Sequence, residues 1–74
     1  MPTLWRTVLA ALTDPAAADR DQVLALGAAD LALDQNSAAS SGDVQDIALA
    51  EFGIALDPRT ATAALTARRA HRSG

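Results

Sequence analysis

The sequence contains no cysteine, no lysine and no tyrosine, and its aromatic side chains are one Trp and one Phe. The lack of cysteine excludes disulfides, thiolate zinc sites, iron–sulfur clusters and cysteine nucleophiles. The four glycines are scattered and do not form the glycine-rich patterns that cradle phosphates. Apolar runs are short as well, since none approaches the ~20 residues of a membrane span, and the first residues lack the features of a secretory signal. We therefore expect a protein with no membrane span, located by default in the cytoplasm.

Large apolar residues are also scarce. Alanine supplies 19 of the 74 residues, whereas Leu, Val, Ile, Phe, Trp and Met together supply 18. A domain of this size buries only about 60–65% of the surface that its unfolded chain exposes. A catalytic pocket of about 300 Å³ or more would use much of such a core. The composition thus predicts one small domain over residues 1–74 that is not an enzyme, and it favours a homodimer that completes the burial.

Charge is distributed unevenly along the chain. Residues 1–57 hold two arginines and nine acids and carry a net charge of −7, whereas residues 58–74 hold four arginines and carry +4. This asymmetry predicts an acidic body with a basic C-terminal segment. Two interpretations are open: the arginines form a binding surface, or they complement the dipole of their own helix.

The spacing of apolar residues predicts an all-α fold, a small bundle of four short helices, or five if the second helix breaks near Asp19 to Asp21. Residues 35–42 are polar and small and predict a flexible loop, in which Ser40 has no structural role. Residues 72–74 are expected to form a frayed tail. The helices are expected over residues 3–13, 15–33, 43–52 and 58–71.

Helix boundaries are predicted from capping residues. Asp14 is expected to cap the second helix with Pro15 at its first position, and Asp43 is expected to cap the third. Gly53 is expected to end the third helix in the left-handed conformation. Asp57 and Pro58 together give the start of the fourth helix. Within the second helix, a glycine at position 27 indicates a kink or a close helix crossing.

Catalytic, cofactor and metal sites are not indicated by the sequence. The nine acids lie mostly at helix starts or on polar faces, where capping explains them. The single histidine, His71, has no Cys or acid at metal-ligand spacing. Three loop serines lie outside any nucleophile elbow; they are Ser37, Ser40 and Ser41.

The segment from Asp43 to Leu65 resembles the helix-turn-helix of bacterial repressors and transposase-type DNA-binding domains, a likeness limited to about residues 43–70. It contains a helix that ends in Phe, then Gly-Ile, then a capped helix that begins Pro-Arg-Thr. The resemblance implies a small, dimeric DNA-binding or regulatory protein. Four polar residues share an arc of the fourth helix, and two further arginines lie near them. The implied DNA-binding residues are Arg59, Thr62, Thr66, Arg68, Arg69 and Arg72.

Two alternatives to DNA binding remain open. The segment also fits an ordinary αα-hairpin in an acidic helical adaptor, which would bind another protein around Trp5 and Leu9. The stretch from Ala50 to Asp57 further resembles the end of helix two in acyl carrier proteins. Those proteins attach phosphopantetheine to the Ser of Asp-Ser-Leu, whereas Ser37 here lies in Gln-Asn-Ser-Ala-Ala. A carrier function is therefore the least favoured of the three.

Overall fold

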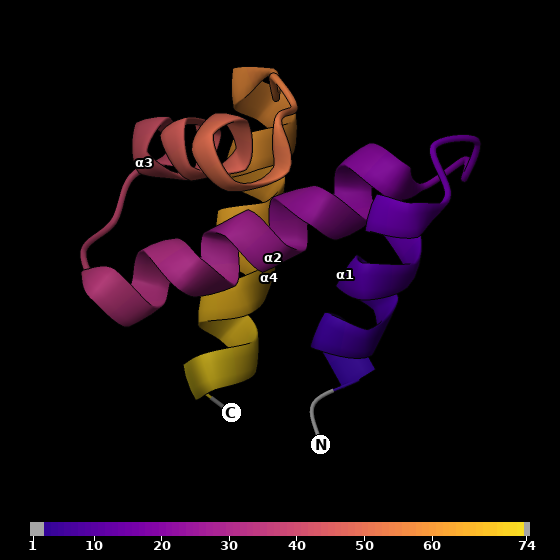
Figure 1. Ribbon diagram of the computed structural model, residues 1–74. Helices are drawn as coiled ribbons and strands as arrows, with labels where there is room; N and C mark the ends of the chain where they lie inside the picture. The colour runs from indigo at the N-terminus through magenta and orange to yellow at the C-terminus, as the bar shows by residue number, and fades with distance from the viewer. Residues whose placement is uncertain (1–2, 74) are drawn as a thin grey trace.

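The computed structural model describes the backbone of residues 3–73 and the side chains of residues 4–72, and it confirms the small all-α bundle. The residues described contain no strand. Helix α2 crosses the middle of the molecule and contacts every other helix (Figure 1). Helix α4 crosses behind α2, while α1 and α3 lie toward opposite ends of α2. The elements are α1 (Thr3–Thr13), α2 (Arg20–Gln35), α3 (Ser41–Ile47), η1 (Ala48–Phe52) and α4 (Pro58–Ser73).

The predicted first helix is confirmed, but the predicted start of the second is wrong. Helix α2 begins at Arg20 after Asp19 rather than at Pro15, so the chain does break near Asp19. The Asp14 carboxylate instead accepts a hydrogen bond from the Ala16 amide at 3.2 Å. This bond to the residue two positions on closes a local turn, which competes with a helix start.

The start of α3 lies one turn earlier than the sequence predicts. Ser40 is the N-cap, since its hydroxyl accepts a hydrogen bond from the Asp43 amide while the Asp43 carboxylate accepts one from the Ser40 amide. This reciprocal pair is a capping box. Asp43 is therefore the third residue of the helix and not its cap. The loop shortens to residues 36–40, and Ser40 has a structural role that the sequence analysis denied it.

The turn between η1 and α4 agrees with its prediction. Helix α3 continues without interruption into the π-helix η1, which ends at Gly53 with φ 68° and ψ 23°, in the left-handed region. Asp57 then caps α4, because its carboxylate accepts a hydrogen bond from the Thr60 amide at 3.1 Å. Helix α4 continues to Ser73, so residues 72–73 belong to the helix rather than to a tail. Residue 74 lies outside the described residues.

Small residues let the helices approach closely around α2. Four alanines of this helix are fully or almost fully buried, namely Ala25, Ala28, Ala29 and Ala32. At Gly27, an added Cβ would lie 3.0 Å from Val8 Cγ2 of α1 and 3.4 Å from Phe52 Cζ of η1. Gly27 therefore marks the close crossing that its position indicated. Since Phe52 also packs against both core clusters, α1, α2 and η1 meet at this point.

Candidate functional site

The six residues proposed to bind DNA all lie on α4, but they do not share one surface. Thr62 and Thr66 are exposed, and so is Arg59 near the helix start. Arg69 is exposed too, yet its guanidinium donates a hydrogen bond to the Ala39 carbonyl at 2.6 Å. The remaining two arginines point toward α2. The structure thus brings Arg68 and Arg72 together against another helix and leaves the others apart from them.

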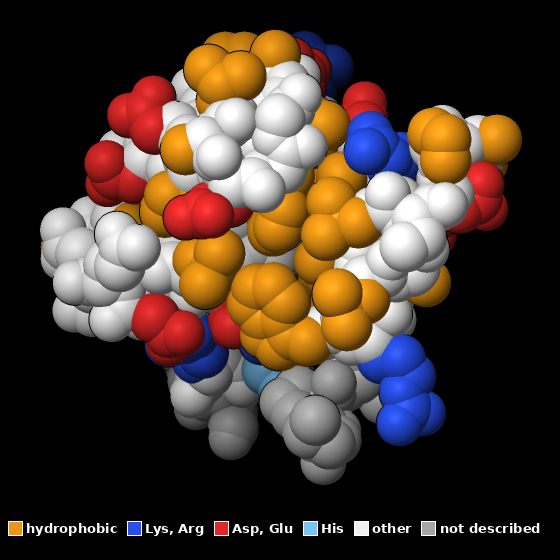
Figure 2. Space-filling view, in the orientation of Figure 1, with side chains coloured by type: hydrophobic (Ala, Val, Ile, Leu, Met, Phe, Trp, Pro, Cys, Tyr) orange, Lys and Arg blue, Asp and Glu red, His pale blue; other side chains and the backbone are white. Residues whose placement is uncertain are grey.

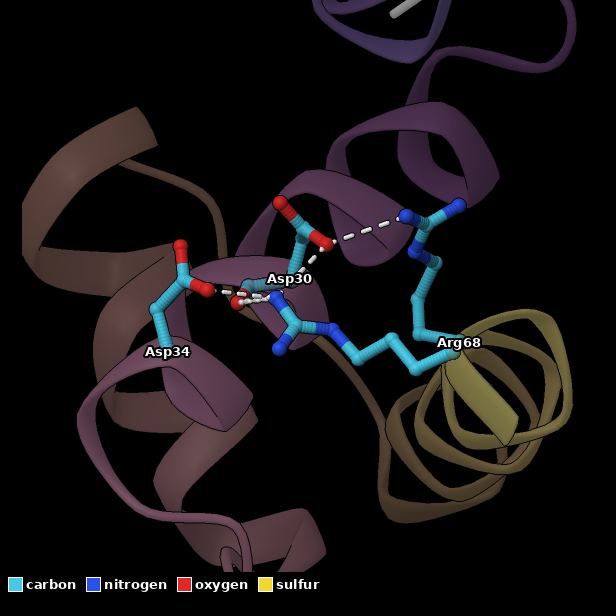
Figure 3. Close-up of polar contacts among 4 residues, drawn as sticks. Asp30, Asp34 and Arg68 are labelled. Carbon is cyan, nitrogen blue, oxygen red and sulfur yellow. Dashed lines mark hydrogen bonds and ion pairs between the residues drawn. The ribbon is translucent and has the colours of Figure 1, made fainter. Parts of the chain in front are cut away.

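An acidic residue of α2 receives both of these arginines. Nη2 of Arg68 lies 3.0 Å from Asp30 Oδ1, and Nη2 of Arg72 lies 3.1 Å from the same oxygen (Figure 3). Arg72 also donates to the Asp30 carbonyl and forms an ion pair with Asp34. The side chains of Asp30 and Arg68 are only 13% and 16% exposed. These four residues, which we call the α2–α4 clasp, are joined by contacts that span 38 to 42 residues of sequence.

The contacts of the clasp shift the pKa of two of its members, Asp30 and Arg72. Burial raises the pKa of the Asp30 carboxyl, but hydrogen bonds from Arg72 and Arg68, together with their charges, outweigh it and leave that pKa below its ordinary value. Hydrogen bonds to Asp34 and Asp30 raise the pKa of Arg72. Both shifts favour the charged forms of Asp30 and Arg72, so the ion pair between them is closed at neutral pH.

The clasp was not predicted from the sequence, although its residues follow a recognisable spacing. Asp30 and Asp34 are four residues apart on one helix, and Arg68 and Arg72 are four residues apart on another. Residues four apart lie on the same face of a helix. The acidic face of α2 can therefore pair with the basic face of α4 where the two helices cross. The two arginines of α4 therefore pair with acids of the same molecule. Within residues 3–73, Arg59 alone among the four C-terminal arginines forms no hydrogen bond or ion pair.

The second feature is an apolar face on α1. Trp5, Leu9 and Leu12 fall within about 60° of one another at 100° per residue, beside the stripe of Leu4, Val8 and Ala11 that faces α2. Leu9 is 62% exposed and Leu12 is 36% exposed. Leu12 is exposed because α1 packs mainly on α2, and this one neighbour covers only part of the wide apolar side of α1. Trp5 is half-buried against the core. We call Trp5, Leu9 and Leu12 the α1 face.

The α1 face continues into a wider apolar surface. Phe52 and Ile54, from the end of η1 and the following turn, are half-buried and pack on the same core cluster as Trp5. Figure 2 shows the result as a band of hydrophobic side chains between α1 and the α3–η1 helix. Leu49 of η1 is another large apolar residue that is mostly exposed, at 61%. The sequence could not separate these exposed positions from buried ones, because all of them follow helical spacing.

The remaining surface offers a shallow hollow. It has a volume of about 390 Å³ and lies between α2 and the first turns of α4, with Arg59, Gln22 and Thr60 among its polar lining residues. Among the residues that the structure describes, no group of His, Asp and Glu side chains is placed to hold a metal ion. None of the described helices is long and apolar enough to cross a membrane.

Comparisons of the chain with protein-family models, with curated proteins and with solved structures gave no match. The site must therefore be interpreted from its own chemistry. Its two principal parts are a partly buried ionic clasp between α2 and α4 and an open apolar face on α1.

Proposed function

We propose that this protein is a small helical docking module that binds another protein through the α1 face. The observation that carries the proposal is the exposure of Leu9 and Leu12 in one stripe with the half-buried Trp5. Isolated exposed leucines are common on soluble proteins, but a contiguous apolar band marks an interaction surface. Burying one leucine side chain is worth about 1.5–3 kcal/mol, so covering this stripe supplies a driving force for association.

The composition of the α1 face also suits a protein partner. Tryptophan is enriched among the residues that dominate binding energy, especially where a ring lies at the centre of a contact. Trp5 is already held by packing against the core, so little side-chain freedom is lost when a partner covers it. Leu9 and Leu12 follow it at intervals of four and three residues, and together they form a ridge that fits an apolar groove.

DNA binding through α4 is the second candidate. The left-handed Gly53 and the Asp57 cap set α4 at the end of a helix-turn-helix-like hairpin, with Arg59, Thr62 and Thr66 exposed. The charges favour the first candidate, however. Arg68, Arg69 and Arg72 already have partners in the protein, and the net charge of −3 opposes approach to a polyanion.

A capture experiment with two matched baits tests the choice. Leu9→Gln places an amide on the α1 face, whereas Ala10→Gln places the same amide on the exposed side of α1, about 100° away from Leu9. We expect wild type and Ala10→Gln to retain the same protein from the native host, and Leu9→Gln to lose it. Nuclease treatment and 0.5 M salt should leave the capture unchanged, because the contact is apolar. Equal capture by the two variants, or nuclease-sensitive capture, would rule out docking through the α1 face.

A further inference from the structure

We infer that the occupant of the α1 face is a second copy of this chain, docked with two-fold symmetry so that α1 of each copy lies against the α3–η1 edge of the other. The inference rests on the proposed function and names its partner. It follows from the charges that border the apolar band, from the two-fold geometry that those charges permit, and from the dimensions of the molecule.

The two edges of the apolar band carry opposite charge. Arg6 is the one charged residue in Thr3–Thr13, and it borders the α1 face because it precedes Leu9 by three residues. On the other edge, α3 and η1 contain only acids among their charged residues. Figure 2 shows a basic side chain beside the N-terminal end of α1 and acidic side chains along α3. The band is thus positive on one edge and negative on the other.

Glu51 is the acid best placed to meet Arg6 of another copy. It lies in η1 directly before Phe52, which packs on the same core cluster as Trp5 and belongs to the apolar band. Both Arg6 and Glu51 are exposed, and within the described residues neither side chain forms a hydrogen bond or an ion pair. Each of these charges can therefore accept a partner without breaking an existing contact.

Two-fold symmetry brings the two edges together. When two identical faces meet about an axis that runs along the apolar band, the positive edge of each copy lies over the negative edge of the other. Arg6 then faces Glu51 of the second copy, and the contact occurs twice. An unrelated partner would need the reverse charge pattern on its own surface, whereas a second copy supplies that pattern by symmetry.

The dimensions of the molecule suit such a contact. A stable interface buries about 800 Å² on each partner, which is roughly a sixth of the 4584 Å² accessible surface of this chain. The molecule measures 32 by 27 by 18 Å, so its broad side is large enough to supply that area. A chain with so few large apolar residues also gains from extending its core across an interface.

Charge reversal, measured by sedimentation equilibrium, tests this arrangement. We expect wild type to be a reversible dimer, with the fluorescence of its single tryptophan, Trp5, shifting to the red on dilution. Arg6→Glu and Glu51→Arg should each raise the dissociation constant about tenfold or more, because each places like charges opposite one another twice. An equimolar mixture of the two variants should return to within about threefold of wild type, because both contacts in the mixed dimer are again complementary.

Control variants carry the same change of charge away from the interface. Arg59→Glu on α4 and Asp21→Arg on α2 should shift the dissociation constant less than about twofold, with helicity by circular dichroism unchanged in every variant. A wild type that stays monomeric at millimolar concentration overturns the inference. So do controls that weaken the dimer as much as the edge variants do, or a mixture that fails to restore it. The wild-type protein could also be monomeric and still capture a host protein that Leu9→Gln no longer captures. That outcome would overturn the homodimer but would leave the proposed docking function of the α1 face intact.

Discussion

Asp30 is a buried acid whose charge is retained because two arginines surround it. Its carboxylate is bonded to Arg68 and Arg72, and it is the most buried acid in the described chain. On the other side of the clasp, Nε of Arg68 is buried and has no hydrogen-bond partner among the described residues. A buried ion pair adds little over an apolar replacement, but removing one member leaves the other charge uncompensated. The two arginines of α4 therefore depend on Asp30 as their shared counter-ion.

Asp30→Asn should consequently destabilise the fold far more than Asp34→Asn. The first change leaves the Arg68 guanidinium without its buried counter-ion, and we expect a loss of about 3 kcal/mol in the free energy of unfolding. The second change removes an acid that is 60% exposed, so its cost should lie within about 1 kcal/mol. Urea unfolding followed by circular dichroism at pH 7 measures both. Equal losses would mean that the clasp is not closed in solution.

The lowered pKa of Asp30 also predicts the pH range in which the clasp acts. A carboxyl group whose pKa is lower in the folded than in the unfolded state stabilises the fold above the unfolded pKa of about 3.9. This contribution disappears as the pH falls through the folded value. The difference in unfolding free energy between wild type and Asp30→Asn should thus be constant from pH 5 to 7 and should shrink below about pH 4. A difference that persists at pH 2 would show that charge is not its origin.

Among the elements, helix interiors were predictable from the sequence, whereas several helix starts were not. The apolar spacing gave α1 correctly, and the Asp57-Pro58 pair gave the start of α4. The start of α3 was missed because two residue pairs, Ser40 with Asp43 and Asp43 with Asp46, have the same spacing for a capping box. The buried position of Val44, just inside the helix, favours the earlier pair. The pair that forms the capping box therefore depends on packing between elements, which the spacing of the capping residues does not specify.

The cap predicts a contrast between two serines. Ser40→Ala removes the oxygen that accepts the Asp43 amide hydrogen bond, so it should cost about 0.5–2 kcal/mol of unfolding free energy. Ser37→Ala in the same loop changes an exposed residue outside the helix and should stay within about 0.5 kcal/mol. Chemical unfolding of both variants provides the comparison. A neutral Ser40→Ala would place the start of α3 elsewhere.

Two glycines predict opposite responses to alanine. At Gly27 an added methyl group would lie 3.0 Å from Val8 Cγ2, so Gly27→Ala should push α1 away from α2 and cost about 1–3 kcal/mol. At Gly42, in the exposed part of α3, the nearest atom to a new methyl group is Ser40 Oγ at 3.6 Å. Gly42→Ala should therefore stabilise the helix by about 0.5–1 kcal/mol. Thermal unfolding measures whether each variant is more or less stable than wild type. A Gly27→Ala variant that is more stable than wild type would contradict the close crossing of α1 and α2.

For the molecule as a whole, the sequence predicted the all-α class and the charge asymmetry but not where the charges go. The pairing of Asp30 with Arg72 spans 42 residues and depends on how α2 and α4 cross, which periodicity within each helix does not specify. The α1 face was only partly predictable for the same reason. Trp5 and Leu9 were candidates from helical spacing, whereas the exposure of Leu12 follows from α1 having one main neighbour.

The same charge distribution predicts how the protein responds to a polyanion. Binding to duplex DNA weakens with salt at a log–log slope of about −0.9 for each phosphate contact, so four free arginines would give roughly −3 to −4. On α4, Arg68, Arg69 and Arg72 have partners within the protein, and Arg59 is the one free arginine of that helix, so we expect at most weak binding through α4 with a slope near −1. Fluorescence anisotropy of a labelled duplex from 20 to 200 mM salt measures the slope, and Arg59→Ala should remove the contribution of α4 to the binding. A slope of −3 or steeper in wild type would instead mean that the clasp opens to DNA, and α4 would then replace the α1 face as the functional surface.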